Sequence, residues 1–206
     1  MRVHEYTIIG HSRAKIGRWL AIGAGLIASG GVTVGIAAID LAKRAGIETS
    51  GSLIIWPITS GVVFAALYFS FDYWIWKLPV ASRLLNIPNL AGKWEVTGQS
   101  LGQKGEVLHD WKGLITITQS WEKIRVFLET KTSDSYSISA ALLPDRDIGC
   151  RLMYSYRNEP KLGNPDLKPH DGYAEIIFHP KNGVGNGDYF NKQRFTFGTT
   201  KLKKVG

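Results

Sequence analysis

The stretch Trp19–Ile39, with the sequence WLAIGAGLIASGGVTVGIAAI, decides the first part of the fold. It holds 21 residues and no Asp, Glu, Lys, Arg, His, Asn or Gln. A helix of that length, rising about 1.5 Å per residue, crosses a hydrocarbon core about 30 Å thick. Arg13, Lys15 and Arg18 precede the run as in a secretory signal peptide, but the run is longer than a signal core of about 7 to 15 residues, and a second apolar run follows. We therefore predict a membrane-spanning helix.

The second apolar run is Thr49–Phe71, which has 23 uncharged residues with Pro57 near its start. Aromatic residues gather at its end, as in an interfacial belt: Phe64, Tyr68, Phe69, Phe71, Tyr73, Trp74 and Trp76. The loop between the runs is too short to fold by itself, so residues 19–76 are predicted to form a two-helix transmembrane hairpin after an N-terminal segment, 1–18. Basic residues are more numerous outside the hairpin than in its loop, which predicts a multi-pass protein with both termini in the cytoplasm.

The first run is rich in small residues with helical spacing. Gly31 and Gly35 form a G-x-x-x-G pair, and Ala24 and Ala28 repeat the spacing. Small side chains let helices approach closely in lipid, where van der Waals packing drives association. Two interpretations remain open, since these residues could pack the hairpin against itself or pack one chain against another.

The rest of the chain predicts an all-β domain. Residues 77–89, with Pro79 and Pro88, are predicted as a linker, and residues 90–206 as a cytosolic antiparallel barrel of eight strands, closed so that no edge is exposed. The predicted strands are Gly92–Gln99, Val107–Gln119, Lys123–Lys131, Tyr136–Leu143, Cys150–Tyr156, Gly172–His179, Gly187–Asn191 and Phe195–Lys203.

Alternation along the predicted strands separates two faces. Tyr154, Tyr156 and Asn158 share one face, and Arg151 and Arg157 lie on the other. The interior of an eight-stranded barrel is either filled by side chains or wide enough for one small ligand. Aromatic residues that share a face with hydrogen-bonding groups suit a planar ligand, and if the tyrosines point inward, the two arginines point outward.

The sequence shows none of the spacings typical of metal or catalytic sites. It has no H-x-x-x-H pair, no Walker A loop and no G-x-S-x-G turn, so we predict no metal, no catalytic residue and no enzymatic activity. Cys150 is the single cysteine and cannot form an internal disulfide. The net charge of +8 indicates an anionic partner or a membrane surface.

Short motifs along the chain resemble one known family. They are LAGKWEV at 90–96, TQSW at 118–121, IRVFL at 124–128, YSYRNEP at 154–160, HDGYAE at 170–175 and GDYFN at 187–191. Together with the two apolar runs, these motifs resemble the two-transmembrane, β-strand-rich effectors of bacterial CBASS anti-phage signalling, which accompany cyclic-oligonucleotide synthases. The resemblance covers essentially the whole chain.

The resemblance implies a receptor in the bacterial inner membrane whose cytosolic barrel binds a cyclic dinucleotide. Binding would promote homo-oligomerisation of the helices, disrupt the membrane and kill the infected cell. The partners implied are this activating ligand and the lipid bilayer, with no cofactor and no DNA or RNA polymer. The bases and the linkage of the ligand do not follow from the sequence.

A cyclic dinucleotide needs stacking faces, base-edge hydrogen bonds and cations. The candidates are Trp121, Tyr154, Tyr156 and Tyr189 for stacking, Gln119, Asn158 and His170 for base edges, and Arg125 and Arg194 for the phosphates, with Arg151 and Arg157 only if their face points inward. Arg194 departs from the family pattern, because it follows Tyr189 and Phe190 at a greater distance than expected.

Other interpretations remain open. Barrel aromatics also serve as core residues, and for Trp94, in the Gly-x-Trp position at a strand start, the core interpretation is favoured. A constitutive membrane-anchored, lipocalin-like protein that binds a lipid or another small molecule is one alternative function. A module that recruits a soluble partner to the membrane is another.

Overall fold

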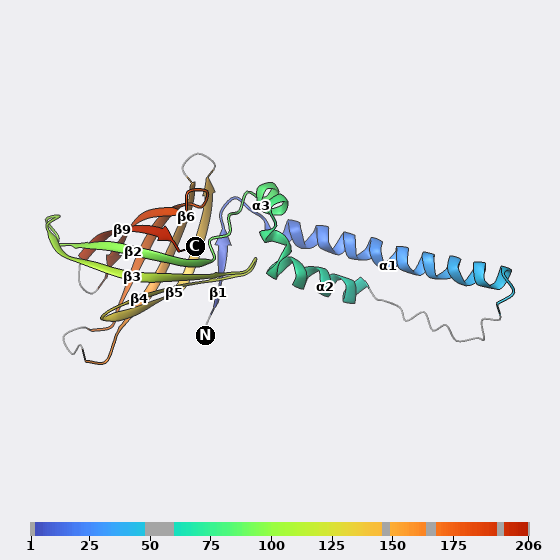
Figure 1. Ribbon diagram of the computed structural model, residues 1–206, viewed down its shortest axis with the longest axis horizontal. Coiled ribbons are helices and arrows are strands. Elements are labelled where there is room, and N and C mark those ends of the chain that lie inside the picture. The colour runs from blue at the N-terminus through green and yellow to red at the C-terminus, as the bar shows by residue number, and fades with distance from the viewer. Residues whose placement is uncertain (1–2, 48–59, 146–148, 164–167, 193–195, 206) are drawn as a thin grey trace. The chain divides into compact units, whose positions relative to one another are not determined.

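The computed structural model describes residues 3–47, 60–145, 149–163, 168–192 and 196–205. It divides into a helical unit, Ser12–Ile75, and a β unit formed by Met1–His11 together with Trp76–Gly206. Figure 1 shows the helices of the first unit and the strands of the second.

The helical unit contains α1 (Arg13–Arg44) and α2 (Ser60–Tyr73). Within the described residues, α1 is the one helix long and apolar enough to cross a membrane. The predicted first span is therefore confirmed as a helix. The predicted second span is not found as a whole: α2 covers it only from residue 60, and its first part lies outside the described residues. The two helices contact each other, and Ala24 is the buried residue of α1.

The β unit is a closed barrel with the strand order β1-β4-β3-β2-β9-β8-β7-β6-β5. Strands β2 to β9 form an antiparallel meander that closes where β2 pairs with β9, as predicted. Their bounds are Gly92–Leu101 (β2), Val107–Gln119 (β3), Lys123–Thr130 (β4), Ser133–Asp145 (β5), Gly149–Pro160 (β6), His170–His179 (β7), Val184–Asn191 (β8) and Thr196–Lys204 (β9).

A ninth strand, β1 (His4–Ile8), corrects the prediction of eight. Strands β4 and β5 pair directly only near their connecting turn, at Phe127–Glu129 and Asp134–Tyr136. Farther from the turn, β1 lies between them, antiparallel to β4 and parallel to β5. A strand of five residues carries too little alternation to be recognised from sequence alone. Within the predicted N-terminal segment 1–18, residues 4–8 therefore form part of the barrel wall, and residues 13–18 already belong to α1.

The connection into β2 is also structured. It contains a 3₁₀ turn, η1 (Ile75–Lys77), where the predicted hairpin ends, and a short helix, α3 (Pro79–Leu85), in the segment predicted as a linker. Pro79 stands at the first position of α3, where its missing N–H costs nothing, and Asn86 ends the helix in the left-handed region with φ 54°.

One end of the barrel is packed solidly. Trp94 is fully buried, its indole N–H donates to the Leu90 carbonyl at 3.0 Å, and its ring meets Phe178 edge to face at 4.8 Å between centroids. Ile117 and Leu152 fill the same interior. Trp94 is therefore a core residue, as the sequence favoured.

The other end carries small side chains on the same inward face. Gly98 and Ser100 follow Trp94 and Val96 in the alternation of β2, and Gly198 and Thr200 precede Leu202 in β9. Strand β8 contributes Gly187, which pairs with Thr200. A barrel that changes from large to small inward residues along its axis is filled at one end and hollow at the other.

Gln119 closes the packed end through hydrogen bonds. Its side-chain oxygen accepts from the Leu90 N–H at 2.8 Å, and its amide nitrogen donates to the Tyr6 hydroxyl at 3.2 Å. We expect Gln119→Leu to lower the free energy of unfolding by about 1–3 kcal/mol, because the buried Leu90 N–H loses its acceptor. Urea unfolding followed by tryptophan fluorescence measures the change.

The control is Gln99→Leu, since the Gln99 amide donates to Asp110 at 2.9 Å on the exposed face of β2. We expect a change within about 0.5 kcal/mol there. Equal losses in the two variants would contradict a structural role specific to Gln119.

Candidate ligand-binding site

A cavity of about 240 Å³ occupies the hollow end of the barrel. The turns that follow β2, β4, β6 and β8 surround this end. The lining residues are Ser100, His109, Trp111, Ile115, Leu128, Thr130, Thr132, Ser133, Ser135, Tyr154, Tyr156, Asn158, His170, Ala174, Ile176, Tyr189, Asn191, Thr196 and Thr200.

Five residues that the sequence proposed as ligand contacts lie together in this lining. They are Tyr154, Tyr156, Asn158, His170 and Tyr189, which come from β6, β7 and β8. The structure thus brings residues from three of the quoted motifs to one cavity. That they touch a ligand stays a prediction.

The alternation of β6 decides which of its side chains reach the cavity. Tyr154 and Tyr156 are buried inside the barrel. Arg151 and Arg157 lie on the outer face, where Arg151 pairs with Glu175 at 2.6 Å and Arg157 lies 3.6 Å from both Glu159 and Asp171. The outward arginines are therefore engaged with carboxylates of the outer wall.

Glycines make room for the aromatic rings of the cavity wall. A Cβ at Gly172 would overlap the Tyr156 ring, and a Cβ at Gly198 would overlap the Tyr189 ring. A Cβ at Gly98 would likewise overlap the Trp111 ring. The positions of these rings thus depend on the absence of side chains on neighbouring strands.

Tyr189 is held by a network of hydrogen bonds. Its hydroxyl lies 2.7 Å from the Ser100 hydroxyl and accepts from the Trp111 indole N–H at 3.1 Å. Ser100 in turn lies 3.2 Å from Nε2 of His109. The Trp111 and Tyr189 rings meet edge to face at 5.9 Å, so this side of the wall is fixed before any ligand arrives.

A second group of wall residues is also held by side-chain hydrogen bonds. The Tyr156 hydroxyl donates to Asn191 Oδ1 at 2.5 Å, and the Asn191 amide donates to the Thr196 hydroxyl at 2.9 Å. The Asn158 amide donates to the hydroxyls of Ser133 and Ser135 at 3.0 and 2.9 Å. The donor groups of both amides are thus engaged within the wall.

Tyr154 differs from its neighbours. Its side chain is only 7% exposed, and its hydroxyl makes no hydrogen bond with any described residue. Burial raises the pKa of Tyr154, so the hydroxyl stays protonated at neutral pH. A hydroxyl that lines the cavity and has no partner among the described residues is a donor available to a ligand there.

Two other proposed contacts lie at the packed end instead. Trp121 is 1% exposed, and its ring contacts His11 edge to face at 5.4 Å and lies 6.3 Å from Trp76. Gln119 bonds to Leu90 and Tyr6 as described above. Neither residue lines the cavity, because the turn between β3 and β4 lies at the opposite end of the barrel.

None of the proposed phosphate contacts that the structure describes lies in the cavity lining. Arg125 stacks its guanidinium over the Phe127 ring at 4.6 Å, on the face of β4 opposite to the buried Ile124 and Val126. Arg194 lies outside the described residues. The described lining contains no lysine or arginine, and its basic residues are His109 and His170.

Sequence reasoning missed several wall residues, notably Trp111, His109, Ser100 and Asn191. A signal for Trp111 and His109 was present, since both are in phase with the buried Ile115 along β3. The run of small inward residues in β8 and β9 is the signal that could have located the hollow end.

A closed barrel with a hollow, polar and aromatic end, on a chain that also carries a long apolar helix, defines the class of membrane-associated β-barrel binding proteins. Comparison with known families identifies both parts. Residues 14–77 match the family described as Cap15, TM helices, and residues 85–204 match Cap15, cyclic dinucleotide receptor domain.

The chain is also similar along its full length to a curated protein. CD-NTase-associated protein 15 of Yersinia aleksiciae is 35% identical over 208 residues, which cover 100% of this chain and 99% of the relative. The chain therefore belongs to the Cap15 family, and the resemblance to two-transmembrane CBASS effectors is confirmed.

Proposed function

We propose that the barrel binds a cyclic dinucleotide in the cavity beside Tyr154, and that binding activates a membrane effector of anti-phage signalling. The observation that carries this proposal is the Tyr154 hydroxyl, which has no partner among the described residues, on a side chain that lines the cavity with Tyr156 and Tyr189. The match of residues 85–204 to a cyclic dinucleotide receptor domain supports a cyclic dinucleotide as the ligand. Stacking on aromatic rings contributes about 1–3 kcal/mol per base.

The size and charge of the cavity support one arrangement of the ligand. Its volume of about 240 Å³ is below the range of about 300–1,000 Å³ usual for small-molecule pockets, so a dinucleotide would extend to the mouth. We place the bases inside and the phosphates at the mouth, near His109 and His170. The exposed Lys131, Lys168 and Lys192 lie in the turns at this end.

The lipid-carrier alternative receives less support. The lining does include apolar residues such as Ile115, Leu128 and Ile176. A lipid tail would nevertheless leave the serine, threonine, asparagine and histidine groups of this cavity without partners from the ligand. We retain it as an outcome of the test below.

Strand β1 connects the barrel to α1 through a short segment of chain, so a change in the barrel wall can act on the helix. It ends at Ile8, and α1 begins at Arg13, so four residues join the barrel wall to the apolar helix. We propose that ligand binding changes the wall around β1, promotes assembly through α1, and disrupts the inner membrane, with both termini in the cytoplasm.

The test uses the full chain reconstituted in lipid nanodiscs. Thermal unfolding is measured with a panel of cyclic dinucleotides, their linear counterparts and free fatty acids, and chemical crosslinking in liposomes reports assembly. We expect one cyclic dinucleotide to raise the unfolding temperature and to increase crosslinked oligomers. Stabilisation by fatty acids alone, or by no cyclic dinucleotide, would contradict the proposal.

The G-x-x-x-G pair gives a second prediction. Both Gly31 and Gly35 lie on α1, and a Cβ at Gly31 would meet no described atom within 4 Å. We expect Gly31→Leu to abolish ligand-induced crosslinking and toxicity in cells while ligand affinity is unchanged, because leucine separates closely packed helix backbones. Gly30→Leu, on a neighbouring face of the helix, is the control. Full assembly of the Gly31 variant would remove this pair from the mechanism.

A further inference from the structure

The short helix α3 lies in the chain segment between the transmembrane family match and the receptor family match. The transmembrane family match ends at residue 77 and the receptor match begins at residue 85, so most of α3 falls between them. Pro79 follows Tyr73, the last residue of α2, by six residues. Six residues span at most about 20 Å, so the start of α3 cannot lie farther than that from the end of α2.

One face of α3 is apolar and uncovered. Val80 and Leu84 lie one turn apart and are 80% and 85% exposed, and Leu78, just before the helix, is 55% exposed. The other side is fixed to the barrel unit, because the Ser82 hydroxyl donates to the Ile87 carbonyl at 3.0 Å and Ile87 is buried. The helix is therefore held with its apolar face outward.

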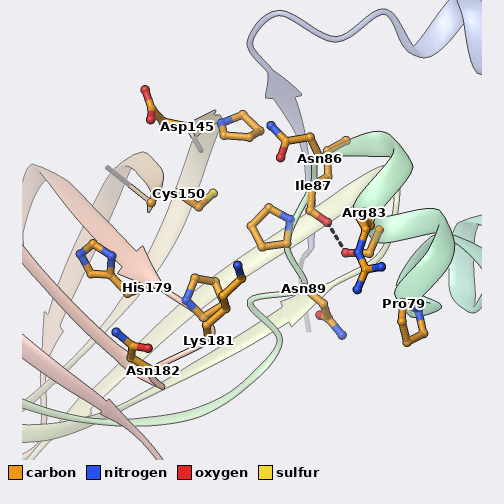
Figure 2. A pocket seen from close by; sticks show the side chains of 15 residues that line it. Pro79, Arg83, Asn86, Ile87, Asn89, Asp145, Cys150, His179, Lys181 and Asn182 are labelled. Carbon is orange, nitrogen blue, oxygen red and sulfur yellow. Dashed lines mark hydrogen bonds between the residues drawn. The ribbon is translucent and has the colours of Figure 1, made fainter. Parts of the chain in front are cut away.

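A cavity of about 800 Å³ lies beside α3, within the barrel unit. Figure 2 shows Arg83 and Asn86 on its α3 side, and Lys181, Asn182 and His179 on the side formed by the β7–β8 turn. Arg83 and Lys181 are both exposed. The lining thus offers two cations, together with amide groups, on opposite walls, and one carboxylate, Asp145, at the end of β5.

We propose that α3 and this cavity form a membrane-surface contact that binds the headgroups of anionic phospholipids. Val80 and Leu84 enter the boundary between acyl chains and headgroups, as the apolar face of an interfacial helix does. Arg83 and Lys181 contact the phosphates of the same leaflet, and Lys77, at the end of η1, adds a third cation. The bilayer is favoured as the occupant because a single residue of the chain separates the end of the transmembrane family match, at residue 77, from the start of α3 at Pro79.

Site-directed nitroxide labelling of the full chain in nanodiscs tests the apolar contact. The labels replace Leu84 or Leu162, as Leu84→Cys or Leu162→Cys, in a Cys150→Ala background. Leu162 is fully exposed in the connection between β6 and β7, at the end of the barrel away from α3, and serves as the control. We expect the label at 84 to be more accessible to oxygen than to a water-soluble nickel complex, and the label at 162 to show the reverse.

Two results would overturn the lipid contact. The first is equal water accessibility at both positions. The second is shielding of the label at 84 from both reagents with dipolar broadening between labels, which would assign this face to a second copy of the chain.

A second measurement tests the headgroup preference. Native mass spectrometry compares the phosphatidylglycerol and phosphatidylcholine retained by the full chain. We expect Arg83→Gln and Lys181→Gln each to lower the preference for phosphatidylglycerol about fivefold. Lys201→Gln, an exposed position on β9, is the charge control. An unchanged preference in the double variant would overturn the assignment of these cations to headgroups.

Discussion

Replacing Tyr154 with alanine is expected to weaken cyclic dinucleotide binding by roughly 5- to 150-fold, the equivalent of about 1–3 kcal/mol for one lost stacking surface. Tyr154 is buried in the cavity wall, and its ring lies 6.2 Å from that of Tyr156. The variant removes both a stacking face and the hydroxyl that has no partner among the described residues. Isothermal titration of the full chain in detergent measures the affinity.

One further variant separates the contribution of the Tyr154 ring from that of its hydroxyl, and a second serves as a control on the outer face. Tyr154→Phe keeps the ring and removes the hydroxyl, so we expect weaker binding with little change in the stability of the free protein. Tyr173→Ala removes a tyrosine from the outer face of β7, where its ring packs on Phe190, and should leave affinity unchanged. If Tyr173→Ala weakens binding as much as Tyr154→Ala, the ligand does not occupy the interior cavity.

Replacing Trp94 with alanine is expected to lower the free energy of unfolding by about 3–5 kcal/mol. This is a large share of the 5–15 kcal/mol that typically stabilises a domain. The change empties the packed end, removes the ring contact with Phe178 and leaves the Leu90 carbonyl without its indole donor. Chemical denaturation followed by circular dichroism of the β signal measures the loss.

Trp111 offers a matched comparison within the same barrel. It is half-buried and already borders the cavity, so its removal enlarges an existing space instead of creating one in a solid core. We expect Trp111→Ala to cost less stability than Trp94→Ala and to weaken ligand binding. Equal losses of stability would show that the two ends of the barrel do not differ as described.

Much of the site could be predicted where local patterns carry the information. The alternation of β6 separated Tyr154, Tyr156 and Asn158 from Arg151 and Arg157, because successive side chains of a strand point to opposite faces. The same pattern could not separate Tyr154 from Trp121, since both are buried aromatics beside polar residues. Whether such a residue lies at the packed end or the hollow end depends on which residues face it from other strands.

The position of the N-terminal strand β1 also could not be predicted from its own residues. Tyr6 and Ile8 are buried only because β4 and β5 separate beyond Phe127 and leave room for β1. Nothing within residues 4–8 indicates that gap, since it is created by strands more than 100 residues away.

The sequence by itself determined a helix long and apolar enough to cross a bilayer, a following meander of antiparallel strands, and the two faces of each strand, because charge-free runs and period-two alternation are local properties. Tertiary structure alone decided that β1 completes the wall, that Gln119 and Trp121 support the packed end, and that Tyr154 lines a cavity. Those outcomes depend on strand pairing and on small inward residues such as Gly98, Gly187 and Gly198, whose effect appears only when distant strands meet around a common interior.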